Sequence, residues 1–276
     1  MAIASLAAYQ TRLKANYKQV HFQKSSITTV QGHTYSSWLG AGFPAAGAAP
    51  TTAGVPTNAT TGALPTINAS GGTQRILRVI INWAINAAGM VTIVDRLSHQ
   101  GGLSGTTTGA QTTNLPTTAL TRYTSGVGVE LGIEIYTTVG TTATVISASY
   151  TNTTPTSGRT TVNSTNGPTF GSASFDIASR LISLPLQSGD VGVTAVASVT
   201  LAASTLTAGA FGVTLYYPIV AIPVTMQDPQ GIDVDALFGF GTWFPQVFDN
   251  ACLQFHYVTN LTSTGVVSGI LYMSTD

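Results

Sequence analysis

From residue 73 onward, short runs of Val, Ile, Leu and aromatic residues alternate with clusters of Gly, Asn, Ser, Thr and Pro. Runs of this length are typical of β-strands, and such clusters are typical of turns. No long amphipathic segment separates them, so crossover helices are not expected. We assign the following runs to strands: Arg75–Ile85, Met90–Leu97, Val129–Tyr136, Ala143–Tyr150, Leu181–Leu186, Val191–Leu201, Phe211–Tyr217, Ile219–Thr225, Leu253–Val258 and Val266–Met273. The pattern predicts an all-β fold, namely a β-sandwich that is jelly-roll-like in its number of strands.

The chain has enough apolar residues for a large core but very few charges for its surface. Hydrophobic residues make up 43% of the 276 residues, whereas charged residues make up 7%, against about 25% in ordinary globular domains. A surface covered mainly by Thr and Ser hydroxyls is typical of proteins that are packed into assemblies. We therefore expect a homo-oligomer, because closed symmetry buries apolar patches that would make a monomer poorly soluble.

The few charges are unevenly distributed along the chain. All three lysines lie in the first 24 residues, and the first acidic residue is Asp95. This asymmetry predicts that the N-terminal segment docks on an acidic partner surface, which includes a neighbouring copy of the chain. Chance in a chain with few charges is the alternative. The residues expected to dock are Arg12, Lys14, Tyr17, Lys18 and Lys24. Nucleic acid is not expected as a partner, because four cations over this segment are few and no binding motif follows them.

Four segments are expected along the chain. The spacing of Ile3, Leu6 and Leu13 predicts an amphipathic helix over residues 3–24, so residues 1–30 form a helical anchor. Residues 31–72 are expected to be an extended arm rich in Gly, Ala, Pro and Thr. Residues 73–225 form the β-sandwich body, and residues 226–276 form an aromatic-rich segment with the final strands. Candidate interface aromatics in this last segment are Trp243, Phe244 and Phe248, for which a sugar-binding face is the alternative.

Two groups of acidic residues lie close together in the sequence. Glu130 and Glu134 are four positions apart on one expected strand, which places them on one face about 13 Å apart. That separation exceeds the roughly 5–9.5 Å used by carboxylate pairs in glycoside hydrolysis, so we expect this face to meet solvent or a subunit. Asp228, Asp233 and Asp235 do not have the spacing of a calcium loop, and turn or helix-cap chemistry explains them more simply.

The remaining reactive residues do not form a recognisable catalytic pattern. Cys252 and His256 share a face of one expected strand but are too far apart for a nucleophile–base pair. No phosphate-binding loop, nucleophile elbow or zinc-protease motif occurs in the sequence. We therefore expect no enzyme activity, no metal and no cofactor. A single cysteine excludes an internal disulfide and fits folding in a reducing cytoplasm. Neither a secretory signal nor an apolar run long enough to span a membrane is expected.

Three stretches resemble virion structural proteins of tailed bacteriophages, and among these the capsid decoration (cement) proteins. They are Leu184–Gly192 with the Val-rich run that follows it, Phe244–Leu253 with the terminal strands, and the turn Tyr150–Arg159. The resemblance covers about the C-terminal half of the chain.

The resemblance implies a β-rich virion component that is folded in the host bacterial cytoplasm and carries no catalytic residues. Its implied partners are the major capsid protein or other virion subunits, bound through the N-terminal arm. The hexagonal geometry of capsid lattices implies a trimer. The alternative function is a tail or head-fibre protein that binds glycans on the host surface.

Overall fold

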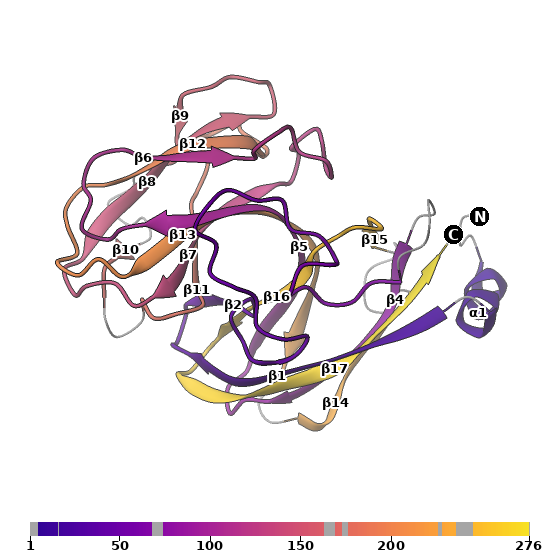
Figure 1. The fold of residues 1–276 in the computed structure, drawn as a ribbon. Helices are drawn as coiled ribbons and strands as arrows, with labels where there is room; N and C mark the ends of the chain where they lie inside the picture. The colour runs from indigo at the N-terminus through magenta and orange to yellow at the C-terminus, as the bar shows by residue number, and fades with distance from the viewer. Residues whose placement is uncertain are drawn as a thin grey trace.

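The computed structural model describes residues 5–15, 17–67, 74–162, 169–172, 176–225, 228–235 and 245–275. It confirms the all-β prediction, because antiparallel strands dominate and the described residues contain one short α-helix. The strands form a closed barrel that lies between two open sheets (Figure 1). The barrel is the main difference from the single sandwich that the sequence predicts. No helix among the described residues is long and apolar enough to cross a membrane.

The first sheet brings the two ends of the chain together. Its strand order is β14 (Asp228–Asp235), β4 (Gln74–Ala84), β17 (Ser263–Thr275), β1 (Tyr17–Thr29) and β3 (Gly42–Phe43), and β15 (Gln246–Val247) also pairs with β4. The central contact is the antiparallel pairing of β1 with β17, which extends from Tyr17 opposite Ser274 to Thr29 opposite Ser263. The segment before residue 30 is therefore an integral part of the body.

The barrel and the second sheet use the middle of the chain. The barrel strands, in order, are β11 (Arg180–Ser183), β2 (Thr34–Ser36), β16 (Leu253–Thr259), β5 (Gly89–Leu103), β13 (Ala210–Val224) and β7 (Glu130–Thr137). The second sheet has the order β10 (Thr169–Phe170), β8 (Thr144–Asn152), β12 (Val193–Leu201) and β6 (Gln111–Leu115), with β9 (Arg159–Thr160) paired to β8. All ten predicted strands are present, and two of them are joined into β13.

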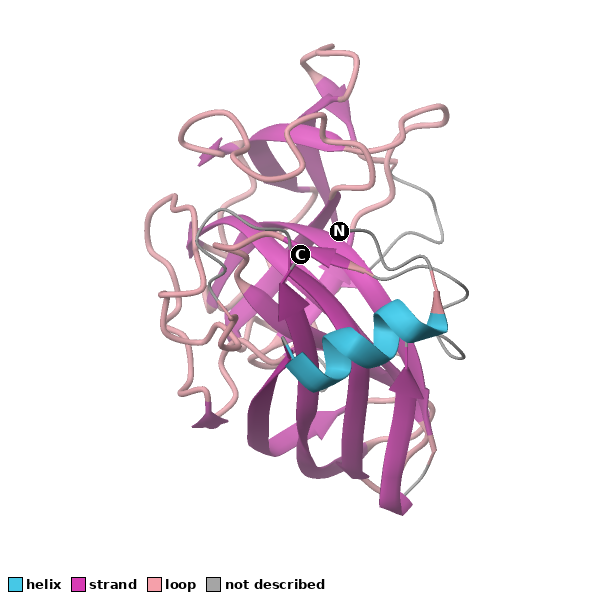
Figure 2. Ribbon diagram, turned by 90° about the vertical axis from the view of Figure 1, so that its right-hand side faces the viewer, coloured by secondary structure: helices cyan, strands magenta, loops and turns pink. Residues whose placement is uncertain are grey.

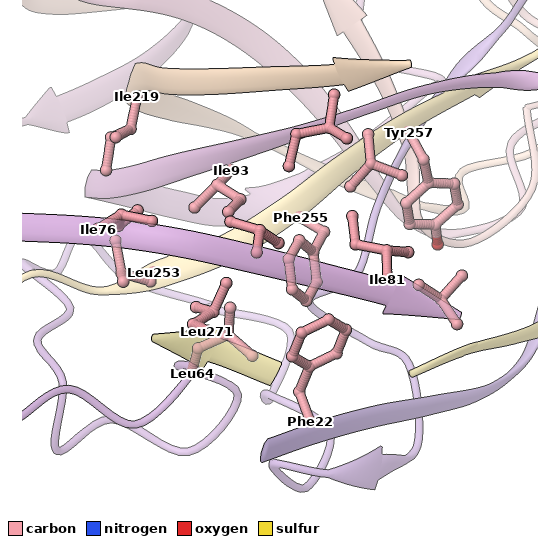
Figure 3. Packing of buried hydrophobic residues seen from close by; sticks show 14 of the residues in the cluster. Phe22, Leu64, Ile76, Ile81, Ile93, Ile219, Leu253, Phe255, Tyr257 and Leu271 are labelled. Atoms are coloured by element: carbon pink, nitrogen blue, oxygen red, sulfur yellow. The ribbon is translucent and has the colours of Figure 1, made fainter. Parts of the chain in front are cut away.

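Two hydrophobic cores lie on opposite sides of the barrel. The first core packs the first sheet against one side of the barrel, with the Phe22 and Phe255 rings 4.5 Å apart at its centre (Figure 3). The second core packs the second sheet against the other side. The long strands β5 and β13 pair along their length and contribute residues to both cores. Register shifts in β13, one of them beside Pro218, redirect its side chains from one core to the other.

The N-terminal helix is shorter than predicted. The helix α1 (Leu6–Ala15) starts at Ser5, whose hydroxyl accepts a hydrogen bond from the Ala8 amide, as an N-cap does. The predicted helical continuation to residue 24 is wrong, because residues 17–29 are strand β1. Val20 and Phe22 alternate with exposed polar residues, which is the two-residue period of a strand. Figure 2 shows α1 lying across the strands of the first sheet.

The predicted extended arm instead folds back onto the body. Gly54 forms an antiparallel bridge with His99, and Leu64 forms one with Leu253. Trp38 is buried, and its indole N–H donates to the Ala48 carbonyl over 2.8 Å. A Cβ atom at Gly47 would lie 2.3 Å from the Trp38 ring. The small residues of this segment therefore allow its backbone to lie directly on a buried indole, which composition alone does not reveal.

Candidate functional site: a sealed polar centre and an open sheet face

A charged network fills the barrel between the two cores. Arg96 on β5 is fully buried, and its guanidinium forms an ion pair with Glu134 on β7, with 2.6 Å between Nη2 and Oε2. The same guanidinium donates to His99 over 2.8 Å and lies 4.3 Å from the centre of the Trp38 ring. Tyr136 and Thr214 each donate to Glu134 Oε2, over 3.2 and 3.0 Å. Side chains from β5, β7 and β13 thus converge on one carboxylate.

The burial of Glu134 corrects its predicted position. The sequence places Glu130 and Glu134 together on a face toward solvent or a subunit, but only Glu130 is exposed. Strand β7 is covered on both faces, since one faces the second core and the other the barrel interior. Burial acts to raise the pKa of Glu134, but the charge of Arg96 and the hydrogen bonds outweigh it and lower the pKa. The carboxylate is therefore charged and paired inside the protein.

The histidines and the cysteine near this network are held neutral by burial. His256 contacts Gln254 through Nε2 over 2.8 Å, and burial lowers its pKa to about 3. Burial and the charge of Arg96 lower the pKa of His99 to about 3 as well. Burial raises the pKa of Cys252 to about 12, so its thiol is protonated at neutral pH. None of these groups has the exposure or the pKa that a nucleophile or general base needs.

A second buried ion pair holds the folded-back segment in place. Arg122 donates to both carboxylate oxygens of Asp95, over 2.8 and 3.0 Å, and also to the carbonyl of Pro56 over 3.0 Å. The backbone amide of Cys252 donates to Asp95 over 2.9 Å. One pair therefore connects β5, the loop before β7, the start of β16 and the segment that was expected to be an arm.

The burial of these ion pairs lowers further the number of charges that the chain has at its surface. Among the side chains that the structure describes, four of the chain's ten Lys and Arg residues and three of its ten acidic residues are buried. Within the described residues, no three His, Cys, Asp or Glu side chains are placed to hold a metal ion. The ion pairs and hydrogen bonds of this closed polar centre fix the barrel strands relative to one another.

The outer face of the first sheet is open and apolar at its centre. A shallow hollow of about 440 Å³ lies on it. Ile80 and Ile270 are half-buried, while Phe43 on β3 is 55% exposed. The hollow is lined by His21, Phe22, Gln23, Phe43, Ile80, Asn82, Ser268, Gly269 and Ile270. Apolar side chains with a polar rim are the usual composition of a protein-binding surface.

Four of the five predicted docking residues have described side chains, and one of these is not available to a partner. Lys24 is buried, and its ammonium donates to the carbonyls of Gly40, Pro44 and Ala45 over 3.0, 2.7 and 3.4 Å. Burial lowers its pKa to about 8. The docking prediction for Lys24 is therefore wrong, because this residue lies on the inner face of β1 and fixes the chain's own loop.

The other docking candidates lie near the open face. Lys14 on α1 and Lys18 on β1 are exposed, and the Arg12 side chain lies outside the described residues. Tyr17 is 39% exposed and stacks on Tyr272, with 5.9 Å between the ring centroids. Docking by these residues stays a prediction.

The predicted interface aromatics are only partly described. Trp243 and Phe244 lie outside the described residues. Phe248 is half-buried and packs edge-on against Tyr123, with 4.9 Å between centroids, while it also contacts the first core. Its role at a subunit interface stays a prediction. The nearby acidic cluster is corrected: Asp228, Asp233 and Asp235 belong to strand β14, not to a turn or helix cap.

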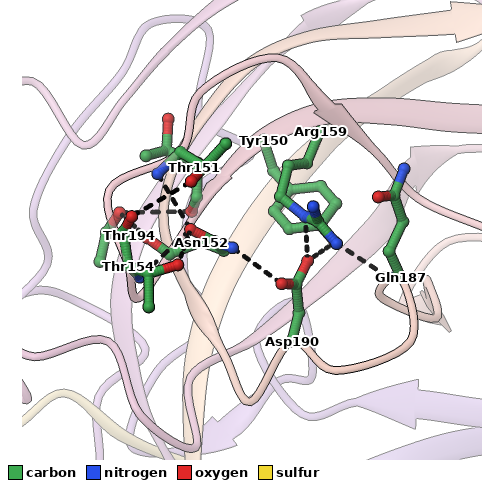
Figure 4. Close-up of polar contacts among 9 residues, drawn as sticks. Tyr150, Thr151, Asn152, Thr154, Arg159, Gln187, Asp190 and Thr194 are labelled. Carbon is green, nitrogen blue, oxygen red and sulfur yellow. Dashed lines mark hydrogen bonds and ion pairs between the residues drawn. The ribbon is translucent and has the colours of Figure 1, made fainter.

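Two of the stretches that carry the phage resemblance meet in space. Asp190, in the loop before β12, accepts hydrogen bonds from Tyr150 and from Asn152 Nδ2, the latter over 2.8 Å, and pairs with Arg159 (Figure 4). Asn152 also caps the following turn, because its Oδ1 accepts from the Thr154 and Thr156 amides. The cluster joins Tyr150–Arg159 to Leu184–Gly192, so it holds two loops at the end of the second sheet.

Comparison with known proteins gives little similarity. No protein-family model and no curated protein matches the chain. A crystal structure of the infectious bursal disease virus VP2 subviral particle is 11% identical, with 94% of this chain and 80% of that chain covered and a TM-score of 0.19. A structure of infectious bursal disease virus Gt strain is 8% identical, covers 94% and 81%, and has a TM-score of 0.18. At such scores the alignment carries no argument about shape or role.

The sequence reasoning overlooked Arg96, Asp95 and Arg122. One signal was present: Asp95 and Arg96 interrupt the apolar run from Met90 to Leu97. A pair of opposite charges inside an otherwise apolar strand requires buried partners. Their partners on β7 and in the preceding loop are distant in sequence, so the pattern could not identify them.

Proposed function

We propose that the chain is a non-enzymatic structural component of a virion, and more narrowly a decoration protein that binds the outer surface of a tailed-phage capsid. The carrying observation is the apolar hollow on the outer face of the first sheet, which is lined by Ile80 and Ile270 and, on the edge strand β3, by Phe43. A face of this kind on a chain with so few surface charges favours permanent contact with other subunits.

Two further observations support the proposal. The titratable groups of the barrel are sealed from solvent, which disfavours a catalytic role for them. Two of the three stretches that resemble phage virion proteins, Tyr150–Arg159 and Leu184–Gly192, are joined by the hydrogen bonds around Asp190. Because the N-terminal cations lie beside the first sheet, we assign the contact with the capsid to this sheet in place of a free arm.

The test is to quantify and locate the protein on purified particles. Mass spectrometry against the major capsid protein is expected to give hundreds of copies per particle, and cryo-electron microscopy is expected to place them on the head exterior. A double variant, Ile80→Ser with Ile270→Ser, should remain folded and lose binding to particles that lack the protein. A count of a few to tens of copies, located on the tail, would overturn the decoration role.

A further inference from the structure

The two edges of the first sheet differ in charge. Strand β1 lies toward one edge and carries Lys18, with Lys14 shortly before it and no acidic residue anywhere before Asp95. Strand β14 forms the opposite edge, and its sequence contains Asp228, Asp233 and Asp235 without a cation, although the Asp233 carboxylate pairs with Arg78 of the neighbouring strand β4. By sequence, one edge strand of the sheet is thus basic and the other is acidic.

Much of the β1 edge has no strand beside it. On one side β1 pairs with β17 along its length, but on the other side only Gln23 and Lys24 pair with β3. No described strand pairs with residues 17–22 on that side. The helix α1 lies over the face of the sheet, where Tyr9 is buried and lies near Arg78 on β4. Unpaired backbone groups along such an edge are a template for another strand.

The β14 edge has a matching length and direction. Its regular pairing with β4 runs from Ile232 to Asp235, after a register shift that follows Asp228. These four residues can pair within residues 17–22 of β1, the six residues that have no described strand on their open side. Successive pairs from β14 through β4 and β17 to β1 are antiparallel, so β14 and β1 run in opposite directions. A second copy that approaches in the same orientation would therefore present β14 antiparallel to β1, as in the sheet itself.

We propose that β1 of one copy pairs with β14 of the next, so that the first sheet continues from copy to copy. Because the two edges are different, the contact is heterologous. It produces a closed ring if the rotation between successive copies brings the last copy back to the first, and an open filament if it does not. Opposite charges favour this pairing over β1 with β1 or β14 with β14. The role of this contact in a virion rests on the proposed function, but the contact itself can be measured on the isolated protein.

The backbone direction gives a sharp variant. The Gln23 carbonyl faces Gly42 of β3, and the hydrogen-bonding groups of a strand alternate between its two sides. The amides of His21 and Gln19 therefore point to the open edge. Gln19→Pro removes one outward donor and leaves the pairing with β17 intact, since proline is tolerated on edge strands.

Sedimentation velocity of the full chain at low and high salt tests the contact. We expect the unaltered protein to associate, and to associate less at high salt. Gln19→Pro, Lys18→Glu and Asp235→Lys should each weaken association by about 10-fold or more with the thermal midpoint little changed. A mixture of the Lys18→Glu and Asp235→Lys proteins should associate again, because the new glutamate on β1 of one variant can meet the new lysine on β14 of the other. Glu130→Lys, an exposed acid on β7, is the matched control and should have no effect.

A protein that stays monomeric at all concentrations overturns the proposal, as does association that Gln19→Pro leaves unchanged or that the charge-exchanged mixture does not restore. These results would leave the virion role standing, because the particle measurements test that role separately.

Discussion

At the scale of single residues, the folded-back segment depends on glycine at position 47. Any side chain there would place a Cβ atom 2.3 Å from the ring of buried Trp38. We expect Gly47→Ala to lower the free energy of unfolding by about 1–3 kcal/mol, because overpacking displaces the indole. Gly109→Ala is the matched control: no atom lies within 4 Å of the added methyl, so the change should be within about 0.5 kcal/mol. Urea denaturation of the unaltered protein and the two variants measures both changes in the free energy of unfolding. Equal midpoints for Gly47→Ala and the unaltered protein would contradict the expected contact with Trp38.

The neutral histidines of the barrel predict a loss of stability in acid. The pKa of His256 is about 3 in the folded protein, against about 6.5 in an unfolded chain. Between these values the unfolded state binds a proton that the folded state does not, so the free energy of unfolding falls as the pH falls from 6.5. The slope is up to about 1.4 kcal/mol per pH unit for each such histidine. Glu134, Gln254 and Tyr216 face the ring, and Arg96 lies nearby.

The His256→Gln variant isolates this contribution. Its free energy of unfolding, measured by urea titration from pH 4.5 to 7.5, should depend less steeply on pH than that of the unaltered protein. His21→Gln, which replaces an exposed histidine, is the matched control. Parallel slopes for the His256→Gln and unaltered proteins would show that burial of this ring does not control the acid response.

At the scale of elements, strand β1 predicts which N-terminal deletion the fold tolerates. Residues 17–29 pair with β17 and place Val20 and Phe22 in the first core. Removing residues 1–15 eliminates α1 and should keep the β-sheet signal in circular dichroism and a cooperative thermal transition. Removing residues 1–30 also eliminates β1, exposes β17 and the part of the first core that Val20 and Phe22 cover, and should give an aggregated or unfolded product. A cooperative, monomeric fold after the longer deletion would refute an integral role for β1.

The strands show how much of this fold the sequence determines. Runs such as Arg75–Ile85 are recognisable because local composition alone distinguishes a strand from a turn. Strand β1 was assigned to a helix because Tyr17 and Val20 also fit a helical spacing, and the sheet partner that decides between the two lies more than 240 residues away. The short strands β2 and β3 exist only because the barrel and β1 provide partners, so their own residues carry no signal.

The same reasoning applies to the candidate site. The charge asymmetry predicts docking by the N-terminal segment, but it cannot separate Lys18, which is exposed, from Lys24, which is buried. Both lysines lie on the same face of β1, six positions apart, and they differ because the loop that contains Gly40, Pro44 and Ala45 covers Lys24 alone. Glu134 was misplaced for a related reason, since a strand covered on both faces does not show the alternation from which exposure is inferred.

At the scale of the whole molecule, β5 and β13 connect the two cores. Val213 and Leu215 on β13 belong to the second core, and Ile219 and Ile222 on the same strand belong to the first. The Arg96–Glu134 pair lies between them and joins β5 to β7. Loosening one core therefore displaces strands that the other core requires. This arrangement predicts one cooperative unit and not two domains that unfold independently.

The variant Leu271→Ala tests this coupling, because Leu271 is fully buried in the first core and lies on β17, far from the second sheet. The lost methyl groups and the cavity should cost about 2–5 kcal/mol. If the cores unfold together, hydrogen exchange in the slowest amides of β8 and β12 should accelerate as much as in those of β4, since both then exchange through the same global opening. Val199→Ala, in the second core, should give the reciprocal result. Acceleration confined to the first sheet would instead show two units, with the β5–β13 pair transmitting no stability between them.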